Sequence, residues 1–245
     1  MLGFIADHRL DQFSEYIFRT DDVFDASDFP DLIAGFAGSD VLAGNGGADT
    51  IHGVTGDDTI DAGDGSDYAL GERGNDSIGG GAGNDLLLGN LGLDTISGGD
   101  GNDTIFGGKE YDVLDGGTGD DLVYGDLGGD DLHDGPGNDT LVAGGGTGDV
   151  DWFYFASGSG QDRVEQFDIG DGDLLRIQTR INNTTIVDFA SLVDRITSDG
   201  HGDSIIDLGG ANYIRLVGVD RADIDASWFA FDDPPGPSLL GGAAA

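Results

Sequence analysis

Residues 35–142 consist of twelve nine-residue blocks in unbroken register: GFAGSDVLA, GNGGADTIH, GVTGDDTID, AGDGSDYAL, GERGNDSIG, GGAGNDLLL, GNLGLDTIS, GGDGNDTIF, GGKEYDVLD, GGTGDDLVY, GDLGGDDLH and DGPGNDTLV. Position six is Asp and position eight is aliphatic in every block, and position four is Gly in every block except at Glu110. A disordered acidic linker would also be rich in Asp and Gly, but it would have no reason to keep an aliphatic residue at every ninth place. A repeat of this length indicates a stack of similar structural units.

Each block predicts a turn followed by a short strand. Gly adopts positive φ without steric cost and Asp is tolerated in turns, so the first six positions favour a tight turn. Positions seven to nine form a minimal strand whose middle side chain points inward while its two neighbours point outward. Two blocks therefore make one coil. The array predicts an all-β stack of about six coils, with alternate blocks on opposite sheets.

The blocks resemble the motif GGxGxDxUx, which is the calcium-binding nonapeptide of RTX, or haemolysin-type, proteins. The resemblance implies a right-handed parallel β-roll, with Ca²⁺ held between successive turns along each edge by Asp side chains and Gly carbonyls. Glu110 departs from the pattern. The implied metal ligands are Asp40, Asp49, Asp58, Asp67, Asp76, Asp85, Asp94, Asp103, Asp112, Asp121, Asp130 and Asp139, with carbonyls of Gly38, Gly47, Gly56, Gly65, Gly74, Gly83, Gly92, Gly101, Gly119, Gly128 and Gly137.

Stacked carboxylates predict that folding depends on the metal. Neighbouring turns would bring Asp side chains to about 4.8 Å, the spacing of adjacent strands, where like charges repel by several kcal/mol at an effective dielectric constant near 20. Ca²⁺ takes six to eight oxygen ligands in flexible geometry and would remove this repulsion. We therefore expect the repeats to be disordered in low calcium and to fold at extracellular calcium levels.

Composition limits the classes of partner. The formal net charge is −38 and Lys109 is the single lysine, so nucleic acid and anionic membrane faces are not expected to bind. Cysteine is absent, which excludes disulfides. No run of 18 apolar residues predicts a membrane span. The first residues lack the basic and apolar regions of a cleaved signal peptide. Together with the RTX resemblance, this implies a secreted, extracellular protein exported by a type I secretion apparatus that reads an uncleaved C-terminal signal.

The segments that flank the blocks differ from them. Residues 1–34 are expected to cap the first coil, with a helix that carries Leu10, Phe13 and Ile17 on one face and with an irregular stretch at residues 21–31. The roll is expected to span residues 35–156. An insertion after residue 142 puts Asp151 out of phase, and SGSGQDRVE predicts one isolated further turn with Asp162 as a weaker ligand candidate.

Residues 157–232 predict a small β-rich module, similar to the C-terminal secretion and capping module of RTX lipases, haemolysin-type proteins and serralysin-like proteases. Residues 166–177 favour a turn between short strands, and residues 188–200 favour a helix that Asp188 caps and Gly200 ends. Residues 203–219 predict a hairpin, and residues 220–231 a short turn and an aromatic strand. Residues 233–245 are expected to form a flexible tail.

The even blocks predict an apolar outer face. Their outward positions read Thr50/His52, Tyr68/Leu70, Leu86/Leu88, Thr104/Phe106, Leu122/Tyr124 and Thr140/Val142, whereas the odd blocks carry small and polar residues there. A contiguous patch of this kind is usually covered by something. The protein's own N-terminal helix or C-terminal module would cover it on one interpretation, and a cell-surface, polysaccharide or protein partner, or a second copy, on the other.

The sequence contains no HExxH zinc motif and no GxSxG nucleophile motif, and its four histidines lie far apart, so no enzymatic activity is expected. The first hypothesis is a stand-alone secreted calcium-binding protein whose roll folds outside the cell and presents a surface for adhesion or interaction. The alternative is the C-terminal calcium-binding and secretion module of a larger secreted lipase, protease or polysaccharide epimerase. Ice binding through Thr59, Ser77 and Thr95 is a third hypothesis, but Val113 and Asp131 interrupt that row.

Overall fold

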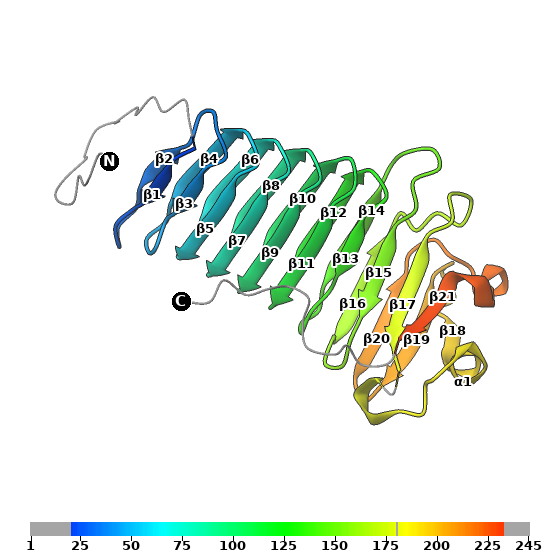
Figure 1. Cartoon of the computed structure of the whole chain (residues 1–245). Helices are drawn as coiled ribbons and strands as arrows, with labels where there is room; N and C mark the ends of the chain where they lie inside the picture. The colour runs from blue at the N-terminus through cyan, green and yellow to red at the C-terminus, as the bar shows by residue number, and fades with distance from the viewer. Residues whose placement is uncertain (1–20, 180, 233–245) are drawn as a thin grey trace.

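The computed structural model describes residues 21–179 and 181–232, and in it the twelve blocks form twelve strands that alternate between two facing sheets (Figure 1). The six coils predicted for the blocks are confirmed. The strands are β3 (Val41–Ala43), β4 (Thr50–Thr55), β5 (Thr59–Asp64), β6 (Tyr68–Arg73), β7 (Ser77–Ala82), β8 (Leu86–Leu91), β9 (Thr95–Asp100), β10 (Thr104–Lys109), β11 (Val113–Thr118), β12 (Leu122–Leu127), β13 (Asp131–His133) and β14 (Thr140–Gly144).

Most of these strands are six residues long, twice the predicted length, because parallel pairing continues into positions one to three of the next block. In β4, for example, Val54 and Thr55 pair with Glu72 and Arg73 of β6. Position two takes positive φ, which is 85° at Val54 and 75° at Glu72. Because positions one to three are paired as strand residues, the sharp turn is confined to positions four to six.

The interior of the roll is filled by position eight, as predicted. These side chains are almost completely buried, while positions seven and nine on either side are largely half-buried or exposed. The buried row consists of Leu42, Ile51, Ile60, Ala69, Ile78, Leu87, Ile96, Ile105, Leu114, Val123, Leu132 and Leu141.

The roll begins earlier than predicted. Residues 21–31 were expected to be irregular, but β1 (Val23–Asp25) pairs in parallel with β3 and β2 (Leu32–Ala34) pairs with β4. Both segments keep the pattern of positions six to eight of the blocks, which is an acidic residue, any residue and a hydrophobic residue. The two triplets are Asp22-Val23-Phe24 and Asp31-Leu32-Ile33. The helix and cap predicted within residues 1–20 lie outside the described residues.

The roll also continues past residue 156, so the predicted boundary does not interrupt the sheets. The sheet that holds the odd-numbered repeat strands β3 to β13, called sheet A, has ten strands. Beyond the repeats it is extended by β15 (Trp152–Phe155), β17 (Leu174–Gln178) and β21 (Phe229–Asp232). The sheet that holds the even-numbered repeat strands β4 to β14, called sheet B, has eleven strands. It is extended by β16 (Gln161–Glu165) and β20 (Asn212–Leu216), which are parallel to the repeat strands. With the coils at both ends, the roll has about nine turns.

The predicted hairpin is present, since β19 (Ser204–Gly209) pairs antiparallel with β20. Asp188 caps α1 (Phe189–Leu192) as predicted, through a capping box with Ser191. The predicted extension of this helix to residue 200 is wrong, because η2 (Val193–Arg195) leads into β18 (Ile196–Ser198), which pairs antiparallel with β19. Three further 3-10 turns are η1 (Ile181–Asn183), η3 (Arg221–Asp223) and η4 (Ala226–Trp228). No helix among the described residues is long and apolar enough to cross a membrane.

One interpretation expected the C-terminal module to cover the apolar face of the even blocks, but the described part of that module, up to Asp232, does not cover it. It extends both sheets and closes the end of the roll, where Phe189 lies 5.2 Å from Phe229 between ring centroids (Figure 1). On the even face the rings of Phe106 and Tyr124 stack with centroids 4.7 Å apart, and Leu86 remains 37% exposed.

Candidate metal centres

The aspartates at position six form two hydrogen-bonded ladders, one along each edge of the roll. In each step the backbone N–H of one Asp donates to Oδ1 of the Asp one coil further on. The N–H of Asp40 donates to Oδ1 of Asp58 at 2.8 Å, and the N–H of Asp49 donates to Oδ1 of Asp67 at 2.7 Å. All twelve predicted aspartates lie in these ladders.

The ladders extend beyond the twelve blocks. Asp151, predicted to be out of phase, accepts from the N–H of Asp130 at 2.8 Å, because the extra residues of the insertion lengthen the coil to 21 residues. Asp162 and Asp173 take the next places, accepting from Asp139 and Asp151. Sequence reasoning missed Asp173, although the triplet Asp-Leu-Leu that it begins resembles positions six to eight of a block.

The second oxygen of most ladder carboxylates is buried and has no hydrogen-bond partner among the described residues. A buried polar atom without a partner is costly, and a buried unpaired charge more so. The unpartnered Oδ2 atoms belong to Asp22, Asp40, Asp49, Asp58, Asp67, Asp76, Asp85, Asp94, Asp103, Asp112, Asp121, Asp130, Asp139 and Asp162 of the ladders, and to Asp134.

Glycines keep the space around these oxygens free of side chains. A Cβ added to Gly35, at position one, would lie 2.3 Å from Oδ2 of Asp40 and 3.0 Å from the carbonyl oxygen of Gly53. A Cβ added to Gly56, at position four, would lie 1.7 Å from the carbonyl oxygen of Gly38. Within the described ranges this Gly38 oxygen accepts no hydrogen bond. Carboxylate and carbonyl oxygens without partners are the donor set that a hard cation such as Ca²⁺ takes, so the residues fit the ion.

A family model described as the RTX calcium-binding nonapeptide repeat (4 copies) matches residues 18–51, 43–78, 79–114, 97–132 and 124–147, more than half of the chain. The chain belongs to the RTX calcium-binding repeat family. Among solved structures, it is similar to the extracellular lipase LipA from Serratia marcescens, with 21% sequence identity and a TM-score of 0.32. The match covers 67% of this chain and 39% of the lipase chain. No curated protein matches the chain.

Glu110 replaces the position-four glycine of an RTX repeat without displacing the backbone. It takes a φ of 79°, and its N–H donates to the carbonyl oxygen of Leu127 at 2.8 Å, as other position-four residues do with the next coil. Its carbonyl oxygen lies 1.6 Å from where a Cβ of Gly128 would be, the same place that a glycine carbonyl occupies in the other repeats.

Burial makes ionisation of the RTX aspartates less favourable than it is in water. Burial raises the pKa of Asp130 and Asp139 to about 8, against a lowering by the backbone N–H that each accepts, and neighbouring carboxylates raise it further. Burial therefore raises these pKa values more than the repulsion between neighbouring carboxylates does, although the sequence suggested repulsion as the main cost. The same cause raises the pKa of Asp112, Asp121 and Asp162 to about 7 and of Asp49, Asp58, Asp76, Asp85, Asp94 and Asp151 to about 6.

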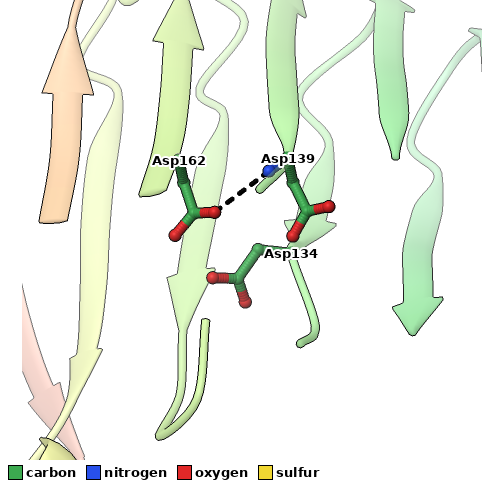
Figure 2. Close-up of side chains that lie close together, drawn as sticks. All are labelled: Asp134, Asp139 and Asp162. Atoms are coloured by element: carbon green, nitrogen blue, oxygen red, sulfur yellow. Dashed lines mark hydrogen bonds between the residues drawn. The ribbon is translucent and has the colours of Figure 1, made fainter. Parts of the chain in front are cut away.

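Asp134 was also not predicted as a ligand from the sequence. It stands at position one of the last RTX repeat, and its carboxylate lies beside those of Asp139 and Asp162 (Figure 2). The only signal in the sequence was the departure of this position from glycine.

Proposed function

We propose that this protein is a secreted, non-catalytic calcium-binding protein whose RTX roll folds when Ca²⁺ binds outside the cell. The observation that supports this most directly is the pair of ladders with buried Oδ2 atoms that have no protein partner. The proposed ligands are these aspartate oxygens, such as those of Asp76 and Asp85, and the glycine carbonyls that face them between coils. Export by a type I secretion apparatus is part of the proposal and follows from the RTX family.

The chain's own residues prepare each site. Oδ1 of each position-six aspartate in the twelve repeats accepts an N–H from the preceding coil, and this bond fixes the carboxylate so that Oδ2 points into the space between coils. The position-one and position-four glycines exclude side chains from that space. Bound Ca²⁺ would supply positive charge that offsets the burial of the carboxylates. Because that charge is needed for folding, binding and folding should occur together.

The even face supports a role in interaction. Its outward side chains form an apolar and aromatic row along sheet B, with Phe106 stacked on Tyr124 and with Leu86 exposed. Aromatic side chains of this kind are enriched where proteins contact partners. We propose that the folded roll presents this row to a cell-surface, polysaccharide or protein partner.

The first test is a calcium titration of chelated protein followed by far-ultraviolet circular dichroism, with Mg²⁺ as the control ion. A cooperative change from coil to β structure is expected at about 0.1 to 1 mM Ca²⁺, the range of extracellular calcium modules, and Mg²⁺ should not reproduce it. A β-rich spectrum in excess chelator that ignores calcium would contradict the proposal.

A pair of variants adds specificity to this test. Asp85→Asn removes one ladder carboxylate and should raise the calcium concentration at the midpoint. Asp61→Asn changes the net charge equally at an exposed outward position and should leave the midpoint unchanged. Equal midpoints for the two variants would mean that overall charge, and not the ladder, governs calcium binding.

A further inference from the structure

Asp134 breaks the rule that governs position one. Ten of the twelve RTX repeats carry Gly there, one carries Ala62 and the last carries Asp134. In the preceding repeat on the same sheet, a Cβ added to Gly116 would lie 2.8 Å from Oδ2 of Asp121. A side chain at position one is therefore directed at the position-six carboxylate of its own repeat, which for Asp134 is that of Asp139.

The fold makes room for this side chain. Strand β13 ends at His133, whereas most repeat strands continue through position three. The step from Asp139 to its ladder partner Asp162 spans 23 residues, compared with 18 between regular repeats. The coil that follows Asp139 is therefore longer than a regular coil, although the turn glycines still stack closely, with a Cβ on Gly160 only 1.7 Å from the carbonyl oxygen of Gly137.

Three carboxylates converge at this place (Figure 2). Asp134, Asp139 and Asp162 are all buried, and one oxygen from each lies within 4.8 Å of the others. The Oδ1 atoms accept backbone N–H groups of Gly135 at 2.7 Å, Asp121 at 2.8 Å and Asp139 at 3.1 Å, respectively.

The Oδ2 atoms of the same three residues are buried and have no hydrogen-bond partner in the part of the chain that the structure describes. Within the described ranges, no Lys, Arg or His forms an ion pair with any of them. The hydroxyl of Ser159 donates to the carbonyl oxygen of Ala156 and lies within hydrogen-bond reach of the Asp134 carboxylate. The cluster thus has the donors of a hard-cation site and no protein counter-charge.

We infer that Asp134, Asp139 and Asp162 form a divalent-cation site of a kind distinct from the regular RTX sites, with three carboxylates that bind one Ca²⁺. The inference builds on the proposed function because Asp139 and Asp162 are also ladder members. Calcium affinity rises with the number of charged ligands, so this site binds more tightly than the others. It joins the last regular repeat to β16, at the place where the coils lengthen and the repeat no longer fixes the register.

Two substitutions test the site. Asp134→Gly restores the residue that the repeat normally has at position one, so the roll should still fold. Asp134→Asn keeps the shape of the side chain and removes its charge. Asp61→Asn is the matched control, since it makes the same change of net charge at an exposed position.

The calcium bound to each variant at equilibrium is measured by dialysis and elemental analysis over a range of free calcium. The folding of each variant is followed by circular dichroism.

Both Asp134 variants should lose the tightest equivalent of bound calcium, with its affinity falling on the order of 10- to 100-fold. The weaker equivalents and the spectrum at saturating calcium should match those of Asp61→Asn. The inference is overturned if the Asp134 variants bind calcium in the same amount and as tightly as the control. Failure of the unsubstituted protein to bind calcium would instead overturn the proposed function. If Asp134→Gly failed to fold at saturating calcium, the calcium count of Asp134→Asn would decide.

Discussion

In most ladder aspartates the two carboxylate oxygens have different surroundings. Oδ1 accepts a backbone N–H from the preceding coil, as Asp94 does from Asp76 at 2.8 Å, whereas Oδ2 is buried without a partner. The first contact fixes the side chain and the second oxygen remains for a cation. One residue type at one position thereby connects the stacking of the coils to the binding of metal.

The raised pKa values predict how the metal-free roll responds to pH. Burial raises the folded-state pKa of Asp130 and Asp139 from 3.8 to about 8, and that of Asp58 and Asp76 to about 6. A group whose pKa is raised by folding adds stability that is complete below its unfolded pKa and is lost as the pH rises through its folded pKa. In excess chelator the roll should therefore be more stable at pH 5 than at pH 8.

Circular dichroism of the chelated protein at pH 5, 6.5 and 8 measures this effect as the fraction of folded protein, because without calcium the repeats are expected to be coil at neutral pH. The calcium-loaded protein is the control and should show the opposite trend, because protons compete with Ca²⁺ for carboxylates. Stability in chelator that stays constant or rises between pH 5 and pH 8 would contradict the prediction.

At the scale of the strand and its turn, the close stacking of coils depends on glycine. Gly74 takes a φ of 134°, and a Cβ there would lie 1.7 Å from the carbonyl oxygen of Gly56. With the φ of Gly74, a side chain cannot occupy that space without moving a coil, whereas Glu110 carries its side chain at position four with a φ of only 79°. The turn must therefore open, or the ladder bonds on either side of it must lengthen.

Gly74→Ala should lower the free energy of unfolding of the calcium-loaded protein by more than about 2 kcal/mol, since both backbone strain and a clash are introduced. Gly200→Ala is the matched control, because its φ is 81° but nothing lies within 4 Å of the added Cβ. It should cost only about 1 kcal/mol. Denaturant unfolding in saturating calcium compares the two, and equal costs would show that the stacking contact is unimportant.

The sequence predicted the six central coils because position six and position eight never lose phase. It predicted the further turn at Asp162 but not the outermost coils, since there only the triplet of Asp, any residue and a hydrophobic residue remains, as at Asp173 and Leu175. The end of α1 was misplaced because Ile196 pairs with a strand whose position local propensity does not specify. Asp134 was missed because its role depends on a coil that lengthens further along the chain.

At the scale of the whole molecule, the roll is a stack in which each coil contacts its neighbours (Figure 1). Stability in such a stack is approximately a sum of coil and interface contributions. The chain carries 48 acidic and 10 basic residues, so no rearrangement of its own side chains balances the charge of the ladders. Cations from solution are therefore part of what holds the stack together.

Deletions test this additive stack. Removing residues 71–88 takes out two repeats and joins Leu70 to Gly89, so every remaining strand keeps its sheet. Removing residues 71–79 takes out one repeat and moves all preceding strands to the opposite sheet relative to those that follow. Both variants should keep the calcium-dependent circular dichroism transition, because each repeat supplies an equivalent aspartate and a hydrophobic core residue. Loss of the transition in the one-repeat deletion alone would show that the outer faces contribute to folding.

The unit of nine residues in the sequence and eighteen in the ladder has an evolutionary consequence. A gene of this kind can gain or lose repeats by unequal recombination, and the core accepts any number of them. Only an even number preserves which side chains share an outer face, since an odd number would divide the row of Phe106 and Tyr124 from that of Tyr68. Selection for binding at that face would therefore be visible as a bias toward even changes in repeat number, whereas selection for calcium-dependent folding alone would leave no such bias.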